Sequence, residues 1–417
     1  MMSSSPKNND NTSDSQLFGT SITFEFVEKQ LQRFFNTKSK FGKNRKAFHI
    51  GVGEGFLSVI ARIYPDWTPK SAELPETVIA KIPNIKTAEE FASNEKFNEL
   101  LGDVEIDKDV MLKMLSSLIT RAHNAESAFY QTITESKIEV KIPKLYFQQP
   151  FSDDCKQGVL LLEDLGTGCA VSKPYEIVSA EEVKQVLKSL SAVHAFSMKH
   201  PEIVKISKLT LADAMKDFGD KDIYQSIVNQ LKKKNPDMAE TCDTVLKYVH
   251  VLKDLSTLET AGEQCGLPPI LVHGDLWSSN VLWRKQANGS RQLAAIIDWQ
   301  VIHRGTPAED IIRIISCTMT PKDRRAQTDE LLHYYYNELE NNYGKKLPFE
   351  LEKLKDSFMK VGAQSMFQVV PILGAVSEVE IDKKCPEKKE ELMAILTGKC
   401  KGLLEDIVAN LTLNHSV

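Results

Sequence analysis

The chain has 417 residues, of which 42% are hydrophobic and 26% are charged, and its formal net charge is −5. This composition is that of a globular protein and excludes a mostly disordered or fibrous chain. The slight acidity and the dispersed Lys and Arg residues give no electrostatic footprint for nucleic acid, so no nucleic-acid partner is expected.

The amino terminus and the cysteines indicate the cellular compartment in which the protein is found. Residues 1–16 are rich in Ser, Asn and Asp and have neither the basic start nor the apolar stretch of a secretory signal, so we expect a disordered tail. The seven cysteines form no CxxC pair and no Cys/His cluster at zinc spacing, which argues against a disulfide framework. No apolar stretch is long enough to span a bilayer of about 30 Å. We therefore expect a cytoplasmic protein without a membrane span.

The first part of the chain predicts a small lobe built on a sheet. Residues 21–35 place apolar side chains at helical spacing, and Thr20 or Ser21 is available to cap this helix. Short β-rich runs separated by Gly- or Pro-rich breaks predict antiparallel strands at residues 48–50, 56–64, 77–82, 143–147 and 159–162. A second helix is predicted over residues 112–133. The first lobe is expected to cover residues 17–165.

Helical periodicity dominates the rest of the chain, and a larger lobe is expected over residues 166–417. Candidate helices lie near residues 180–200, 209–217, 222–233, 237–258, 308–318, 322–342, 349–374 and 388–411. Strand-like runs interrupt them at residues 270–272, 281–283 and 293–297. The last two runs are joined across Asn288 and Gly289, a strong hairpin signal. The predicted fold class is α+β, with an antiparallel-sheet lobe followed by a mainly helical lobe.

The segment from His273 to Trp299 holds the sequences HGDLWSSN and IIDW. Phosphoryl transfer from ATP needs a carboxylate that orients the attacking hydroxyl and accepts its proton, and oxygen ligands that hold Mg²⁺ on the triphosphate. Asp275 suits the first task, and Asn280 and Asp298 offer the hard oxygen donors that Mg²⁺ accepts. Asp275 and Asn280 are five residues apart, as are the base and the metal-binding Asn of the kinase catalytic loop. His273 takes the supporting place of the His in that loop.

Candidate phosphate-binding residues lie in the first lobe. Lys81, in the strand-like run VIAKI, matches the strand lysine that grips the α- and β-phosphates of ATP. Glu126 is its candidate partner, because a lysine is rarely buried without a carboxylate. Gly51, Gly53 and Gly55 lie between two predicted strands, where backbone N–H groups can approach phosphates without a Cβ in the way. Their spacing differs from the kinase pattern GxGxxG, and a simple β-turn is the alternative.

The motif HGDLWSSN followed by IIDWQ resembles that of the aminoglycoside phosphotransferase and choline-kinase superfamily, and more narrowly its ecdysteroid-kinase-like, or CHK-kinase-like, branch. The segments FGKNRKAFHIGVGEGFLS, VIAKIP, HNAESAFY, LLLEDLG and LKSLSAVHAF are also similar to this branch. The resemblance covers nearly the whole chain from Ser21 onward. It implies a bilobal protein-kinase-like fold with a nucleotide-binding first lobe, ATP and Mg²⁺ as cofactors, and a small-molecule alcohol as acceptor.

The resemblance implies roles for three further residues. Glu163 and Leu165 fall in the linker between the lobes, whose backbone would hold adenine, although Glu163 also suits a capping role. Asp310 matches the downstream Asp of the family, whose implied task is to brace the catalytic loop. A carboxylate that interacts with the dipole at a helix amino terminus explains Asp310 almost as well.

The sequence leaves the acceptor open. Aromatic side chains suit a quaternary ammonium group, an apolar wall for a sterol-like alcohol, or ordinary core packing. The aromatic candidates are Trp277, Trp283, Trp299, Tyr334, Tyr335 and Tyr336. The predicted function is ATP- and Mg²⁺-dependent transfer of the γ-phosphate to a hydroxyl of a sterol-like, choline-like or xenobiotic alcohol. The alternatives are phosphotransfer to an amino-sugar or a protein side chain, and a catalytically silent nucleotide-binding or scaffold protein that kept the kinase-like fold.

Overall fold

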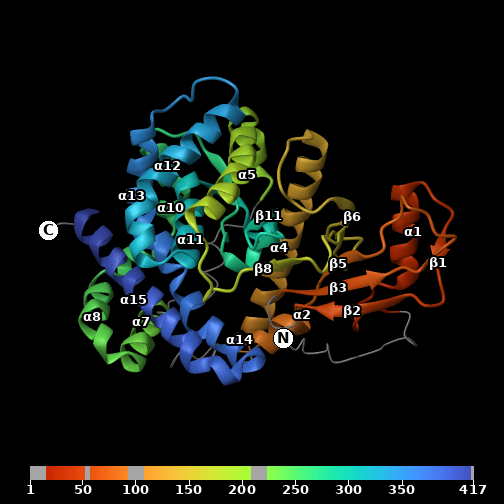
Figure 1. Cartoon of the computed structure of the whole chain (residues 1–417), viewed down its shortest axis with the longest axis horizontal. Coiled ribbons are helices and arrows are strands. Elements are labelled where there is room, and N and C mark those ends of the chain that lie inside the picture. Colours follow the sequence, from red (N-terminus) through yellow and green to blue (C-terminus); the bar gives the residue numbers. More distant parts are fainter. Residues whose placement is uncertain (1–15, 52–56, 93–107, 208–222, 415–417) are drawn as a thin grey trace.

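A computed structural model describes residues 16–51, 57–92, 108–207 and 223–414 of the chain. Several predicted features lie outside these residues: nearly all of the tail at 1–16, the helix at 209–217, and the glycines Gly53 and Gly55. Figure 1 shows the two lobes, with the strands of the first lobe on one side and the helices of the second lobe on the other.

The first lobe is built on a five-stranded antiparallel sheet with the strand order β2-β3-β5-β7-β6 (Figure 1). Its strands are β2 (Lys46–Ile50), β3 (Ser58–Tyr64), β5 (Val78–Pro83), β6 (Leu145–Gln149) and β7 (Val159–Glu163). A short ribbon of β1 (Lys40–Phe41) and β4 (Trp67–Thr68) is also present. The predicted strands of this lobe are therefore present, with ends that differ by one or two residues.

Alternation of side chains gives the sheet two different faces. One face packs against α1 (Phe24–Phe35), and its buried members include Ala61, Ile63, Val78, Ala80, Ile82, Val159 and Leu161. The other face carries Ile60, Arg62, Ile79, Lys81 and Leu162, which line a pocket. Because side chains alternate along β5, Lys81 points away from the apolar cluster and into this pocket, and the pairing of β5 with β3 and β7 holds it there.

The helices of the first lobe are α1, α2 (Ile85–Ala92) and α4 (Lys108–Ser136). The predicted cap of α1 was wrong, because Thr23 caps this helix by accepting a hydrogen bond from the Phe26 N–H at 3.1 Å. Thr20 is engaged in the preceding turn, where its hydroxyl donates to the Leu17 carbonyl at 2.7 Å. The long helix α4 extends from the sheet to the second lobe, where it contacts the short turn η4 (Trp299–Val301).

The second lobe is mainly helical (Figure 1). Its helices are α5 (Ala180–Lys199), α7 (Ile223–Lys234), α8 (Ala239–Lys247), α9 (Val249–Lys253), α10 (Ser256–Gln264), α11 (Pro307–Thr318), α12 (Pro321–Tyr343), α13 (Leu351–Phe367), α14 (Ser377–Lys384) and α15 (Lys389–Asn414). Short helical turns are η1 (Pro201–Lys205), η2 (Pro236–Met238), η3 (Ser278–Asn280), η5 (Ile372–Val376) and η6 (Pro386–Lys388). Every residue of α11 is buried, so each polar side chain on this helix needs a partner inside the protein.

Two predicted helices of this lobe are interrupted. The single helix predicted at 237–258 is divided into α8, α9 and the start of α10. Asp254 has a non-helical backbone, and its carboxylate accepts hydrogen bonds from the hydroxyls of Ser256 and Thr257. Such local side-chain bonding competes with helix continuation. The helix predicted at 349–374 is α13, which ends at Phe367, and Gly374 has a non-helical backbone conformation within η5.

Short strands frame two loops at the junction of the lobes. The predicted hairpin is formed by β10 (Val281–Lys285) and β11 (Arg291–Ile296), and β8 (Cys169–Val171) adds a third strand that the sequence did not predict. The predicted strand β9 (Ile270–Val272) pairs with β12 (His303–Gly305). The loop of residues 273–280, here called the catalytic loop, connects β9 to β10. Its start and end are therefore anchored in two separate sheets.

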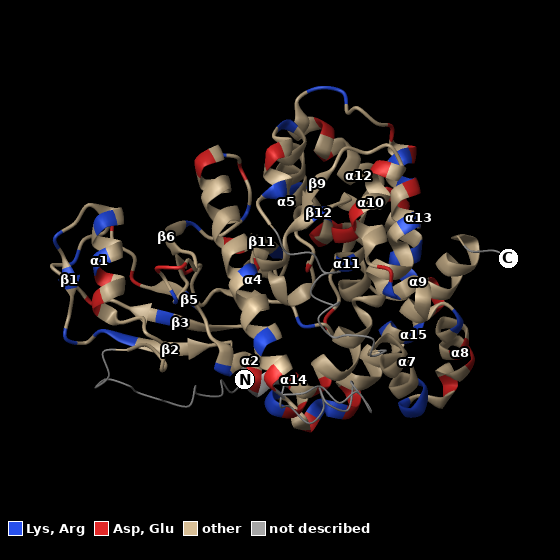
Figure 2. Ribbon diagram, turned by 180° about the vertical axis from the view of Figure 1, so that it is seen from behind, with Lys and Arg blue, Asp and Glu red and all other residues tan. Residues whose placement is uncertain are grey.

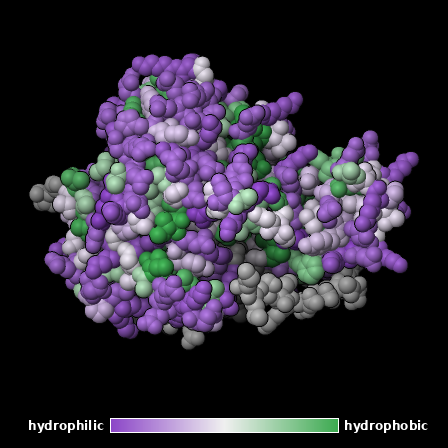
Figure 3. Space-filling view, viewed as in Figure 1, coloured by the Kyte–Doolittle hydropathy of each residue, from purple (hydrophilic) through white to green (hydrophobic). Residues whose placement is uncertain are grey.

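The surface of the molecule is polar. Lys, Arg, Asp and Glu residues are spread over both lobes in Figure 2, and hydrophilic residues cover most of the face in Figure 3. Among the helices that the structure describes, none combines the length and the apolar character needed to cross a membrane.

Candidate active site

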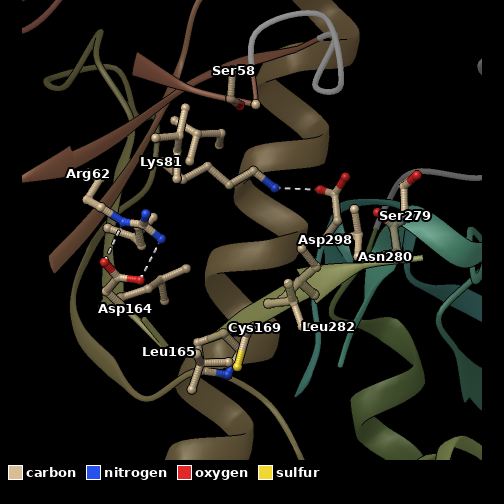
Figure 4. Close-up of a pocket in the computed structure, with 18 of the residues that line it drawn as sticks. Ser58, Arg62, Lys81, Asp164, Leu165, Cys169, Ser279, Asn280, Leu282 and Asp298 are labelled. Atoms are coloured by element: carbon tan, nitrogen blue, oxygen red, sulfur yellow. Dashed lines mark hydrogen bonds and ion pairs between the residues drawn. The ribbon is translucent and has the colours of Figure 1, made fainter. Parts of the chain in front are cut away.

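A pocket of about 490 Å³ lies between the lobes (Figure 4). The first lobe contributes Lys81 and Glu126, and the second contributes Asn280 and Asp298. Residues 162–166 line another part of the wall, together with Cys169 and Leu282. Residues that are more than 200 positions apart in the sequence, such as Lys81 and Asp298, thus meet across one cavity.

Lys81 lies between two carboxylates. Its Nζ is 2.6 Å from Glu126 Oε2, as the sequence predicted, and 2.5 Å from Asp298 Oδ1. Burial alone would lower the pKa of Lys81, but the carboxylates of Asp298 and Glu126 outweigh it and raise the pKa above its ordinary value. Lys81 is 8% exposed and Glu126 is 1% exposed, so this cluster holds a charged ammonium group out of water.

Asp298 has a left-handed backbone conformation, with φ of 67°, directly after β11. This conformation costs a non-glycine residue about 1–3 kcal/mol, so neighbouring contacts have to impose it. The next residue, Trp299, supplies them: its ring stacks on Phe129 of α4 at 4.0 Å between centroids, and its Nε1 donates to the Ile296 carbonyl at 3.1 Å. The packing of Trp299 therefore fixes the direction in which the Asp298 side chain enters the pocket.

Asp310 braces the catalytic loop. Its two carboxylate oxygens accept the backbone N–H groups of His273 at 2.8 Å and Gly274 at 2.9 Å. Burial opposes the charged form of Asp310, but His194, assisted by His273, holds the pKa of Asp310 below its ordinary value. The two hydrogen bonds to the backbone hold the catalytic loop in place, which is the task that the resemblance implied for Asp310.

His273 supports the loop as a neutral ring. Its Nε2 lies 3.0 Å from the Ile297 carbonyl, which can only accept, and its Nδ1 accepts the backbone N–H of Asp275 at 3.2 Å. The proton is therefore on Nε2. Burial lowers the pKa of His273, in keeping with the neutral form. His273 joins the loop before Asp298 to the backbone of Asp275, and it does not line the pocket.

Asp275 and Asn280 are joined within the loop. The Asn280 Nδ2 donates to the Asp275 backbone carbonyl at 2.8 Å and to its carboxylate Oδ2 at 3.3 Å. Both of these hydrogen bonds use the Asn280 Nδ2, so its Oδ1 is left to act as a metal ligand where Asn280 lines the pocket. The Asp275 side chain is 30% exposed, but the protein around it removes enough water to raise the pKa of its carboxyl to about 7, while Arg313 opposes the rise.

The donor set fits a nucleotide with its magnesium ion. Among the described residues, no group of three His, Cys, Asp or Glu side chains is placed to hold a metal ion. Mg²⁺ is commonly held by one or two carboxylates together with substrate phosphates and water, so Asp298 and the Asn280 Oδ1 suffice on the protein side. Lys81 offers the positive charge that phosphates need on the opposite wall.

A protein-family model named DUF1679, with the description "Uncharacterized oxidoreductase dhs-27", matches residues 12–415. The chain belongs to this family.

Two relatives and one solved structure are similar to this DUF1679 chain. The Caenorhabditis elegans "Uncharacterized oxidoreductase dhs-27" is 25% identical over 330 residues, which are 76% of this chain but 38% of that protein, so the chain spans well under half of its length. A C. elegans "Uncharacterized kinase-like protein" is 26% identical over 280 residues, 64% of this chain and 70% of that protein. A Plasmodium vivax ethanolamine kinase matches 93% of this chain and 90% of its own, with a TM-score of 0.42 and 12% identity.

The predicted relationship to kinase-like proteins is confirmed by the kinase-like relative. The predicted bilobal α+β fold, with an antiparallel sheet in the first lobe and a mainly helical second lobe, is also confirmed.

Three further predicted residues of this DUF1679 chain line the same pocket. Gly51, with φ of 65°, lines it at the start of the loop that follows β2. Glu163, the last residue of β7, and Leu165, between β7 and β8, line it where the two lobes are connected. The carboxylate of Glu163 accepts the Lys144 backbone N–H at 3.2 Å, which ties this connection to β6.

The sequence did not indicate two ion pairs of the site. Arg62 and Asp164 form a two-point contact at 2.6 and 3.0 Å in the pocket wall, and Figure 4 shows it beside Leu165. Arg313 of α11 lies 3.1 Å from the Asp275 carboxylate. No local signal in the sequence indicates the second pair, because its partners lie 38 residues apart in two different segments.

The aromatic candidates for acceptor binding are mostly core residues in this DUF1679 chain. Trp283, Trp299 and Tyr335 are buried and belong to the main hydrophobic cluster, and Tyr334 and Tyr336 pack against it. Trp277, next but one after Asp275, is half-buried and packs against the second cluster of the helical lobe. Of the three uses that the sequence left open, packing within or against the hydrophobic clusters describes all six side chains, and Trp277, Tyr334 and Tyr336 are the partly exposed ones.

Proposed function

We propose that this chain is an ATP- and Mg²⁺-dependent phosphotransferase that moves the γ-phosphate to a hydroxyl of a small molecule, a sterol-like, choline-like or xenobiotic alcohol. One observation carries the proposal: a cation, Lys81, and two oxygen donors, Asn280 and Asp298, face one pocket, and a carboxylate, Asp275, is hydrogen-bonded to Asn280. Phosphotransfer requires this combination of groups. The oxidoreductase name of the longer relative is not carried over, because the match covers 38% of that protein.

In this mechanism Asp275 orients the acceptor hydroxyl and takes its proton as the hydroxyl attacks. Its carboxylate is prepared for this task by three neighbours: the backbone brace from Asp310, the ring of His273, and the amide of Asn280. Lys81, kept charged by Glu126, binds and orients the phosphates. Asn280 and Asp298 would hold the magnesium ion, which when bound neutralises charge on the transferring phosphoryl group. Leu165 and Glu163 belong to the wall that would hold adenine.

The proposal is tested with the full chain, Mg²⁺ and γ-labelled ATP over a panel of sterols, choline-like amines and xenobiotic alcohols. We expect at least one acceptor to become labelled. Asp275→Asn should lower kcat by about 10²–10⁴-fold, the contribution of a positioned general base. Asp237→Asn is a matched control, because its carboxylate pairs with Lys401 on the surface, and it should leave kcat unchanged. Equal rates for the wild type and Asp275→Asn would contradict the role of Asp275.

Alkylation of Cys169 distinguishes the catalytically silent alternative from the proposal. Cys169 is a free and partly exposed cysteine in the pocket wall. Bound nucleotide should slow alkylation of Cys169, followed by mass spectrometry of its peptide, and Asp298→Ala should abolish the Mg²⁺-dependent part of this protection. Protection of Cys169 without labelling of any acceptor would favour a nucleotide-binding protein without turnover. Absence of protection at saturating ATP would contradict the nucleotide site itself.

A further inference from the structure

Three polar residues of α11 lie on one face of that helix. Asp310, Arg313 and Cys317 follow the spacing i, i+3 and i+7, which places them along a single stripe. They span about 10 Å of helix at a rise of 1.5 Å per residue. All three are buried, with exposures of 0, 3 and 0%, so this stripe is an internal surface and not a solvated face.

The stripe contacts the catalytic loop in sequence order. Asp310 accepts the N–H groups of His273 and Gly274, Arg313 contacts the Asp275 carboxylate, and the Cys317 thiol accepts the Ser278 N–H at 3.0 Å. The loop therefore runs alongside the helix in the same direction. Because the first and last of these contacts fix backbone atoms, the middle contact is the one that acts on a side chain.

Arg313 has few partners for a buried cation. Its Nη1 donates to Asp275 Oδ1 at 3.1 Å, and its Nε has no hydrogen-bond partner among the described residues. A buried guanidinium is costly unless it is paired, so this contact with Asp275 is the main interaction that offsets its burial. The Asp275 carboxylate is consequently held at both ends, by Arg313 at Oδ1 and by Asn280 at Oδ2.

The loop itself has no room for such a cation. In the kinase pattern HRD an arginine precedes the aspartate, but here Gly274 occupies that place, with φ of 76°. A Cβ on Gly274 would lie 2.5 Å from the Val301 carbonyl and 2.6 Å from His303 Nδ1. The positive charge next to Asp275 thus comes from the neighbouring helix instead of from the loop.

We propose that Arg313 is a positioning residue: from α11 it fixes the orientation of the Asp275 carboxylate in which the carboxylate meets the acceptor hydroxyl. This inference rests on the proposed phosphotransfer function. Arg313 lies outside the residues that line the nucleotide pocket, so its effect is on turnover and not on ATP binding.

The test compares Arg313→Ala with Arg324→Ala as a matched control. Both arginine side chains are 4% exposed and each pairs with a carboxylate, Asp275 for Arg313 and Asp406 for Arg324. We expect Arg313→Ala to lower kcat about 100-fold, the effect of a misplaced catalytic group, while the KM for ATP changes less than about twofold. Added guanidinium at millimolar concentration should restore at least a tenth of the lost kcat, because the Asp275 side chain is 30% exposed and accessible to a small cation.

Arg324→Ala should keep its kcat per folded molecule and should not respond to guanidinium. Crystal structures of the two variants give a readout that needs no turnover: the Asp275 carboxylate should leave its present orientation in Arg313→Ala and keep it in Arg324→Ala. An unchanged Asp275 side chain in Arg313→Ala, or a loss of kcat that guanidinium does not restore, would overturn the inference. A wild type that labels no acceptor would instead contradict the proposed function, and the orientation of Asp275 in the two variant structures would still decide the role of Arg313.

Discussion

The two ion clusters of the site differ in their balance of charge. In the first cluster two carboxylates, Glu126 and Asp298, face the single ammonium group of Lys81. In the second, one carboxylate, Asp275, meets one guanidinium, Arg313. The first cluster therefore carries a net negative charge, whereas the second is neutral.

This difference suggests a division of tasks between the clusters. In the proposed mechanism, the excess carboxylate of the first cluster would recruit the divalent cation. Asp298 would exchange the Lys81 ammonium for the metal ion, while Glu126 keeps Lys81 charged. The neutral pair of Asp275 and Arg313 has no excess carboxylate for a cation, so its effect is on the orientation of the Asp275 side chain. In the proposed mechanism the first cluster would therefore bind the metal ion, and the second cluster would orient Asp275.

Lys81→Met breaks the first cluster and has the largest expected effect on stability. Glu126 is 1% exposed and would lose its cation, and removal of one partner from a buried ion pair costs about 3–5 kcal/mol. Urea unfolding should show this loss of free energy of unfolding. The double variant Lys81→Met with Glu126→Leu should recover part of the loss, since the uncompensated carboxylate is gone. Equal stability of the single variant and the wild type would mean that Glu126 does not depend on Lys81.

A second balanced pair lies behind the catalytic loop and responds to pH. His303 Nδ1 faces the Val301 carbonyl at 2.9 Å and its Nε2 faces Glu309 Oε2 at 3.2 Å. Both partners only accept hydrogen bonds, so the ring carries two protons. Burial disfavours the charge, but Glu309, assisted by the Val301 carbonyl and Asp310, raises the pKa of His303 to about 9.

The sign of the pH effect follows from this raised pKa. The stabilisation is complete below the ordinary pKa of 6.5 and is lost as the pH rises through about 9. From pH 6.5 to 9.5 the wild type should therefore lose about 3 kcal/mol more of its free energy of unfolding than His303→Gln. Lys399, whose pKa burial lowers to about 8, titrates in the same range with the opposite sign, so the difference between the two proteins is the diagnostic quantity. Parallel pH profiles would contradict a charged His303.

Local spacing explains which parts of the site the sequence predicts. Asp275 and Asn280 lie in one loop, and their contact at a separation of five residues is visible in the motif itself. The pairing of Lys81 with Glu126 is also predicted, because a strand lysine that faces inward requires a carboxylate and the kinase-like pattern indicates where to find it. The main strands and most of the helices follow from hydrophobic periodicity.

Contacts between distant segments explain what the sequence does not predict. Arg62 and Asp164 are 102 residues apart, and Arg313 is 38 residues from Asp275. Nothing local distinguishes such a charged residue from one on a solvated helix face, because its burial depends on tertiary packing. The same holds for β8, a three-residue strand that exists through its pairing with β10, more than 100 residues later. The interruption at Asp254 is local, but it depends on a competition between hydrogen bonds that periodicity does not describe.

Substitution of Cys317 has the smallest expected effect on stability. It tests whether the charge of Arg313, and not merely contact with the α11 stripe, is what orients Asp275. Its thiol accepts the Ser278 N–H, so Cys317→Ala leaves a buried donor without an acceptor at a cost of about 1 kcal/mol in the free energy of unfolding. Cys317→Ser restores an acceptor and should recover most of that loss in urea unfolding. Neither variant changes a charge near Asp275, so kcat should fall far less than in Arg313→Ala. Cys317→Ala removes a neutral backbone contact and leaves the ion pair between Arg313 and Asp275 in place. If this variant lowered kcat as much as Arg313→Ala, the orientation of Asp275 would therefore depend on the whole stripe and not on the guanidinium of Arg313.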